Sequence, residues 1–194
     1  MGTGKTVSLG FQNSKAQQNY SFNYSNPFLT QDGISRSYGI YYTAQKPGNV
    51  NLESYTVDDI GGTLGYGIPF TEFSSYSLGV GYDHTSIGNT TSSLVSPSVK
   101  AFIAKHGRNY DQAVFTASIG RVTLDRAIFP TSGSNVSVSV SYGAPVFNSS
   151  LSYYKTIGAA DAFYPLGAGF ILEPHATVGY GGGLHDANSL PFFN

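Results

Sequence analysis

The strict alternation of apolar and small polar residues is the feature that most constrains the fold of this chain. In residues 135–142, NVSVSVSY, every even position carries an apolar or aromatic side chain and every odd position carries Asn or Ser. Successive side chains of a β-strand point to opposite faces of a sheet, so this pattern predicts strands with two chemically different faces. The pattern predicts about nine strands, clearly at residues 7–11, 20–24, 38–42, 60–68, 76–83, 115–119 and 135–142 and more loosely at 149–164 and 168–182.

The composition of the two faces indicates what each one contacts. In a soluble β-sandwich the outward face is rich in Lys, Glu, Arg and Thr, whereas here the polar face is mostly Ser, Gly, Thr and Asn. Only 11% of the residues are charged, against about 25% in an ordinary soluble domain. Lipid outside and a polar lumen inside fit better, so we predict an all-β fold, an antiparallel transmembrane β-barrel, with a soluble all-β domain as the alternative. Tyrosines near the predicted strand ends suit an interfacial aromatic girdle, namely Tyr20, Tyr76, Tyr82, Tyr142 and Tyr180.

The connections between these strands alternate between short and long. The short ones, at 26–34, 69–74, 125–134 and 165–167, are rich in Pro, Gly, Thr and Asp, and the long ones cover 46–57 and 87–111. In outer-membrane barrels the short turns face the periplasm and the long loops face outward. The first and ninth strands then both run outward. Residues 98–106 are predicted to form a short helix in the longest loop, with Ser96 or Ser98 near its start.

The strand count leads us to expect a piece of a longer protein. An odd number of strands closes only through a parallel seam, whereas bacterial single-chain barrels are antiparallel throughout. The sequence also begins without an apolar signal peptide. We therefore expect residues 1–194 to be one partial barrel domain.

Composition also excludes several functions. The chain has no Cys, which excludes disulfide and thiol chemistry, and its net charge of −1 argues against a nucleic-acid partner. The four His residues show no metal-ligand spacing, and no motif for a cofactor stands out. We predict no metal and no cofactor.

Two turn sequences carry a family resemblance. Residues 25–35, SNPFLTQDGIS, resemble the SNPYFTxDGxS turn of the BamA-type outer-membrane protein assembly factors, and residues 125–134, DRAIFPTSGS, resemble that family's DRxxFPTxGS periplasmic turn. Residues 179–184 and 190–194, GYGGGL and LPFFN, are similar to the family's WGYGxGL and PF segments. The turn residues that carry the resemblance are Asn26, Pro27, Asp32, Gly33, Asp125, Arg126, Phe129, Pro130 and Gly133.

The resemblance implies the wall of an insertion machine. In the family, periplasmic POTRA domains precede a sixteen-stranded barrel, and this chain would match about strands three to eleven. The implied function is folding and insertion of outer-membrane β-barrel proteins, without enzymatic chemistry. The implied surroundings are the cell outer membrane and its lipid, unfolded client proteins, and accessory lipoproteins bound through the periplasmic domains. The lateral gate and the VRGF loop motif of the family are not in these residues.

The turn residues also have roles that follow from their chemistry. Pro27 and Pro130 are expected to end strands, because Pro cannot donate to the hydrogen-bond ladder. Gly33 and Gly133 are expected at positive φ in tight turns. Asp125 and Arg126 are expected to pair with each other or to bond turn amides, with contact to a partner or neighbouring domain as the alternative.

Other functions remain open at this point. A barrel enzyme of the protease type would depend on Asp83 and His84, although strand neighbours point to opposite faces. His175 is expected to face the lumen on the same side as Glu173, while His106, His185 and Asp186 are expected in loops. A secretion pore and a passive porin are further alternatives, although a porin lumen would carry more charge.

Overall fold

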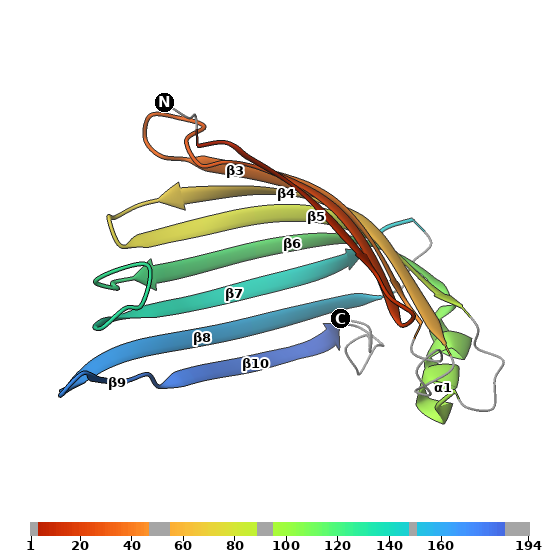
Figure 1. The fold of residues 1–194 in the computed structure, drawn as a ribbon. Helices are drawn as coiled ribbons and strands as arrows, with labels where there is room; N and C mark the ends of the chain where they lie inside the picture. Colours follow the sequence, from red (N-terminus) through yellow and green to blue (C-terminus); the bar gives the residue numbers. More distant parts are fainter. Residues whose placement is uncertain (1–3, 47–54, 89–94, 148–150, 185–194) are drawn as a thin grey trace.

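The structure is a computed structural model that describes residues 4–46, 55–88, 95–147 and 151–184. These residues form one antiparallel sheet of ten strands and a short helix, drawn in Figure 1. The elements are β1 (Thr6–Asn13), β2 (Gln17–Asn26), β3 (Ser35–Gln45), β4 (Thr56–Pro69), β5 (Ser74–Gly88), α1 (Pro97–His106), β6 (Asn109–Val122), β7 (Gly133–Pro145), β8 (Ser152–Gly167), β9 (Phe170–Leu172) and β10 (His175–Leu184).

From β1 to β8 each strand pairs with its neighbour in the sequence, so this part of the sheet is an up-and-down meander. The order runs from β1 to β8 and then to β10, while β9 pairs only with β8. Figure 1 shows the sheet twisting and curving from β1 at one edge to β10 at the other. Within the described residues β1 and β10 do not pair with each other. The antiparallel barrel-wall architecture that the alternation predicts is thereby confirmed.

The two faces of the sheet differ as the sequence predicts. The register places Tyr66 opposite Leu78, Leu78 opposite Ala117 and Ala117 opposite Val140, so apolar side chains form rows across β4 to β7. These rows are exposed; Leu9 and Ile40, for example, are each 63% exposed. The opposite face carries Ser, Thr, Gly and Asp in matching rows, such as Ser77 beside Ser118. A large exposed apolar face is stable only against lipid or a partner.

Aromatic pairs mark both ends of the apolar face. Tyr24 stacks on Tyr38 near the short turns, with ring centroids 4.7 Å apart. Tyr20 stacks on Tyr42 toward the opposite strand ends, with ring centroids 6.1 Å apart. Stacked rings between neighbouring strands add cross-strand stabilisation. The two groups lie where the girdles of an outer-membrane barrel are expected.

A buried apolar cluster lies where the long loops leave the sheet. Ile87, Tyr110 and Leu151 are buried there, and Tyr55, Phe102 and Ile103 pack against them. Helix α1, predicted at 98–106, begins at Pro97 after the N-cap Ser96 and ends before Gly107 at φ 88°. Its residues Phe102 and Ile103 therefore anchor the helix to the ends of β5 and β6 (Figure 1). No helix in the described ranges is long and apolar enough to cross a membrane.

The end of the chain differs from the predicted strands. The sequence pattern places a turn at 165–167 between two strands, but β8 continues to Gly167 and pairs with the three-residue β9. Ala168 and Gly169 both have positive φ, which makes a tight hairpin two residues later than predicted. Pro174 then separates β9 from β10. The described sheet therefore contains one more strand than the predicted nine.

Candidate functional site

The turn between β6 and β7 is organised around the carboxylate of Asp125. Its Oδ1 accepts hydrogen bonds from the backbone N–H groups of Thr131 at 2.8 Å and Ser132 at 3.1 Å. Its Oδ2 accepts from the Thr131 hydroxyl at 2.6 Å and from Arg126 Nε at 3.2 Å. Thr123 and Ser134 close the base of the turn, with Thr123 N–H donating to the Ser134 carbonyl at 2.8 Å. One side chain thus holds both arms of a turn that has no regular secondary structure.

These hydrogen bonds also determine the charge state of Asp125. The Thr131 hydroxyl, followed by the backbone N–H groups of Thr131 and Ser132 and by Arg126, holds the pKa of the carboxyl well below its usual range. Arg126 also donates from Nη2 to Thr131 Oγ1 at 3.1 Å. The predicted pairing of Asp125 with Arg126 and with turn amides is confirmed.

The other residues of this turn have strained or exposed positions. Gly133 has φ +103°, and a β-carbon there would lie 2.3 Å from the Thr123 carbonyl oxygen, so the predicted positive φ is confirmed. Phe129 has φ 54° and is 85% exposed. Pro130 does not end a strand as predicted: β6 already ends at Val122, and Pro130 lies inside the turn. The last ladder pair is Val122 with Asn135, and beyond it the Asp125 carboxylate bonds the N–H groups of Thr131 and Ser132, so these residues form a turn and do not extend the strands to Pro130.

The turn between β2 and β3 is held by a different set of bonds. Asn26, the last residue of β2, is 6% exposed and its Oδ1 accepts from Phe28 N–H at 3.2 Å. Pro27 follows the strand end as predicted. Gly33 has φ +81°, as predicted, and its N–H donates to the Thr30 carbonyl at 3.2 Å. Asp32 is exposed. The two motif turns therefore share the positive-φ glycine and differ in the side chain that bonds the backbone.

Large apolar side chains are exposed at the short connections β2–β3, β4–β5, β6–β7 and β8–β9. They lie at the same end of the strands, beyond the apolar face, and their exposure is not needed for the turn geometry. They are Phe28, Phe70, Phe73, Ile128, Phe129, Leu166 and Phe170. An apolar rim of this kind fits a membrane interface or a contact with another protein. Of these residues only Phe129 is among the turn residues that carry the family resemblance, and all except Phe170 lie inside turns that the sequence predicts.

The pair considered for a protease-type site does not form one. Asp83 accepts a hydrogen bond from the Tyr41 hydroxyl on the lumen face. His84 lies on the apolar face, where its Nδ1 is 2.8 Å from Asp111 Oδ1. Tyr82 donates to the same Asp111 oxygen at 2.5 Å. The two residues point to opposite faces, as strand geometry predicts, so they do not act on one substrate together.

A polar cluster on the lumen face was missed by the sequence analysis. Beside the Tyr41–Asp83 bond, Thr85 donates to Asp59 Oδ1 at 2.9 Å and Gln112 donates to the Leu151 carbonyl at 3.2 Å. Asp59, Asp83, Thr85 and Gln112 line a cavity of about 170 Å³ together with Thr43, Gln45 and Val57. They come from four strands, so only the strand register reveals that they meet.

The register places His175 on the lumen face, as expected. There it bonds Asp161 across β10 and β8, while Glu173 precedes β10. His106 ends α1, in the region predicted as a loop with a helix. His185 and Asp186 lie outside the described residues. Within the described ranges no three His, Asp or Glu side chains come together as metal ligands.

An open antiparallel wall with a lipid-type outer face, a polar inner face and braced short turns defines a transmembrane β-barrel segment. The comparisons with known proteins agree with that class. The Omp85 superfamily domain matches residues 1–194, so the chain belongs to the Omp85 superfamily.

The relatives show how much of a larger protein this chain resembles. It is 27% identical over 202 residues to the outer membrane protein assembly factor BamA of Neisseria meningitidis serogroup B (strain MC58), over 99% of this chain and 25% of that protein. The crystal structure of BamA from Haemophilus ducreyi lacking POTRA domains 1–3 matches with a TM-score of 0.78 at 21% identity, over 98% of this chain and 38% of that one. The chain thus spans about a quarter of the length of that curated relative. The suspected family, the fold and the outer-membrane location are confirmed.

Proposed function

We propose that this chain forms part of the membrane barrel of a factor that folds and inserts outer-membrane β-barrel proteins. The observation that carries the proposal is the superfamily match over residues 1–194, together with the similarity to a protein named as an assembly factor. The apolar face supports it, because it supplies the lipid contact that such a barrel needs. Unfolded β-barrel proteins are the proposed clients.

Within such a factor, these residues supply the wall of the barrel. An unpaired strand edge in lipid leaves backbone N–H and C=O groups without partners, at several kcal/mol each. We therefore propose that residues 1–194 are one partial barrel domain, whose edges β1 and β10 pair with further strands of the same barrel. The strands that open toward lipid are proposed to lie outside this chain, as the family resemblance implies.

The proposed activity is physical and involves no covalent step. Asp83 and His84 point to opposite faces, which removes the pair on which the enzyme alternative depended. The wall then contributes stiffness and shape, so that a client strand meets a defined edge elsewhere in the barrel. We propose that the chain has no catalytic residue and needs no cofactor.

The motif turns are proposed to brace the periplasmic end of this wall. Asp125 and Arg126 tie the β6–β7 turn together, and Asn26 and Gly33 shape the β2–β3 turn. Accessory lipoproteins are proposed to bind through periplasmic domains outside this chain. The exposed Phe129 offers a place where such a domain touches the barrel.

The proposal is tested with the full-length protein in liposomes. A urea-unfolded outer-membrane protein is added, and its folding is followed by heat-modifiable gel migration. We expect faster folding than in protein-free liposomes, and equal rates would contradict the proposed function.

A pair of variants separates bracing from partner contact. Arg126→Ala is compared with Glu72→Gln, a charge-changing control at an exposed position of another short turn. If Arg126 only braces the turn, Arg126→Ala lowers the unfolding midpoint of the barrel and lowers assembly in proportion. If it contacts a partner, heat-modifiability is unchanged and assembly falls.

A further inference from the structure

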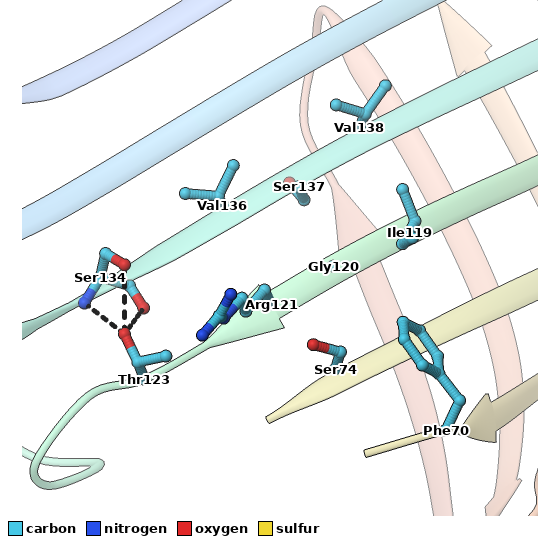
Figure 2. Close-up of a pocket in the computed structure, with 10 residues that line it drawn as sticks. All are labelled: Phe70, Ser74, Ile119, Gly120, Arg121, Thr123, Ser134, Val136, Ser137 and Val138. Atoms are coloured by element: carbon cyan, nitrogen blue, oxygen red, sulfur yellow. Dashed lines mark hydrogen bonds between the residues drawn. The ribbon is translucent and has the colours of Figure 1, made fainter. Parts of the chain in front are cut away.

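A groove on the outer face ends at a cationic side chain, at the turn end of β5, β6 and β7. Its volume is about 500 Å³, and its apolar lining includes Ile119, Val136, Val138 and Phe70. The guanidinium of Arg121 lies at its turn end with the hydroxyls of Ser74 and Thr123, as Figure 2 shows. Ile119 and Val138 belong to the exposed apolar rows, so the groove opens toward lipid.

A second groove continues the first along the wall. Its volume is about 260 Å³, it shares Ile119 and Val138 with the first, and it reaches Ala117 and Val140. The small side chain of Ala117, between Leu78 and Val140, leaves a trough in the apolar rows. From Arg121 to Ala117 the trough runs for roughly 13 Å at about 3.3 Å per residue. Because barrel strands tilt by about 40°, this length is a depth of about 10 Å, which is most of one leaflet of the roughly 25 Å apolar band.

Arg121 is available to a ligand. It is exposed, and in the described part of the chain no carboxylate lies within ion-pair distance of it. Thr123 and Ser134 bond each other, with 3.1 Å between their hydroxyl oxygens, and so hold the rim beside Arg121 in place (Figure 2). A guanidinium is suited to phosphate, because its planar N–H groups match two oxygens at once.

A second arginine occupies a similar place on the outer face. Arg36 is the second residue of β3, as Arg121 is the second-last residue of β6, and both lie at the short-turn end. Its register partner is Tyr66, on the apolar face. Arg36 Nε is buried and has no hydrogen-bond partner in the described ranges. Positive charge therefore recurs at the short-turn end of the outer face, which is the periplasmic end of an outer-membrane barrel.

We propose that this groove binds a glycerophospholipid of the periplasmic leaflet, with Arg121 on the phosphate and one acyl chain in the trough past Ile119 to Ala117. The proposal rests on the membrane orientation of the wall and not on the assembly function. Phosphate alone lacks the chain that the apolar trough accommodates, so the occupant is the lipid and not free phosphate. An acidic lipid is favoured over a zwitterionic one, because Arg121 is the one charged side chain among the described residues that line the groove, and it would repel the ammonium group of a zwitterionic headgroup.

The test is photo-crosslinking in vesicles that contain the full-length protein. The probe is a phosphatidylglycerol with a diazirine in one acyl chain, and the matched probe is the diacylglycerol with the same chains and no phosphate. Labelled peptides are mapped by mass spectrometry. We expect labelling of the β6 and β7 peptides to be about tenfold stronger with the phosphatidylglycerol, as one charge-assisted hydrogen-bond pair supplies.

Variants assign the labelling to the groove. Arg121→Gln is expected to reduce it to the diacylglycerol level, Arg121→Lys to retain most of it, and Ala117→Phe to reduce it by filling the trough. Lys100→Gln, on the exposed face of α1, is the charge-matched control and is expected to change nothing. Excess inorganic phosphate is expected not to compete. Equal labelling by the two probes, unchanged labelling in Arg121→Gln at retained heat-modifiability, or competition by inorganic phosphate would overturn the proposal.

Discussion

Replacing Gly133 with alanine puts a β-carbon into the base of the β6–β7 turn, where the backbone leaves no room. Gly133 has φ +103°, and the new carbon would lie 2.3 Å from the Thr123 carbonyl oxygen and 2.9 Å from Leu124 Cα. These are backbone atoms, so no flexible side chain can move aside. Relief requires the two arms of the turn to separate.

The expected cost has two parts. The left-handed backbone conformation costs an alanine about 1–2 kcal/mol. Separation of the arms weakens the bonds that join Thr123 and Ser134, which include Thr123 N–H to the Ser134 carbonyl at 2.8 Å and Ser134 N–H to Thr123 Oγ1 at 3.0 Å. Each such bond contributes about 1 kcal/mol. We expect Gly133→Ala to lower the free energy of unfolding by about 3–4 kcal/mol.

Gly167→Ala is the matched control for the conformational part alone. Gly167 has φ +89°, and a β-carbon there would meet nothing within 4 Å. It should therefore cost only the roughly 1–2 kcal/mol of the backbone conformation. The difference of about 2 kcal/mol between the two variants measures the steric conflict at Gly133.

The assay is urea unfolding of the full-length barrel in detergent micelles, followed by heat-modifiable migration. With a slope of about 2 kcal/mol per molar urea, the midpoint should fall by about 1.5–2 M for Gly133→Ala and by about 0.5–1 M for Gly167→Ala. Equal shifts for the two variants would refute the steric argument. An unchanged urea midpoint in both variants would refute the premise that an alanine at positive φ destabilises the barrel.

Three further predictions concern the faces, the outer cluster and the charge of the turn. Val140→Lys, opposite Ala117, puts a charge on the lipid face and should cost about 2–4 kcal/mol near the midplane, while its lumen-facing neighbour Ser139→Lys should cost less than 1 kcal/mol; equal urea midpoints would contradict the face assignment. Ile87→Ala leaves a cavity beneath α1 and should cost about 2–5 kcal/mol, seen as faster proteolysis at α1; unchanged cleavage would mean that the helix is held otherwise. Because the folded pKa of Asp125 is lowered, its contribution is present above the unfolded value of about 3.9 and is lost only as pH falls through the folded pKa. The rate of proteolysis of this turn should therefore be the same from pH 5 to 8 in the native protein, and higher at each of these pH values in Asp125→Asn. Slower cleavage of this turn in the native protein at pH 8 than at pH 5 would contradict the prediction.

The strands could be predicted from the sequence because each strand that crosses lipid needs apolar side chains on its lipid face and therefore shows the same alternation. Residues 135–142 alternate without exception, and the rows through Leu78, Ala117 and Val140 follow once neighbouring strands pair. Positive φ at Gly33 and Gly133 was also predictable, because only a few turn positions favour glycine. Where Pro and Gly are dense, as near Gly167, several hairpins fit the same residues and the pattern does not choose between them.

Groups that meet across strands were not predictable. Tyr41 and Asp83 are 42 positions apart, and the bond between them exists only in one register of three strands. A shift by one residue would turn each side chain to the other face. The same holds for His84 with Asp111 and for His175 with Asp161, whose partners were not anticipated. The register of a strand depends on the geometry of its turns and on all the cross-strand contacts of the sheet together. The sequence of one strand alone therefore contains little information about its register.

The turns, and not the strands, hold the information that separates this wall from other barrel walls. Any barrel in lipid satisfies the alternation of Val136, Val138 and Val140, so that alternation identifies an environment and not a family. The β6–β7 turn makes narrower demands: a carboxylate at 125 to bond the amides of residues 131 and 132, and no β-carbon at 133. Because these demands act together, few other sequences meet them. A family resemblance carried by ten turn residues is therefore stronger than one carried by a strand of the same length, and variants of the turn should disturb the fold of this wall more specifically than variants of its lipid face.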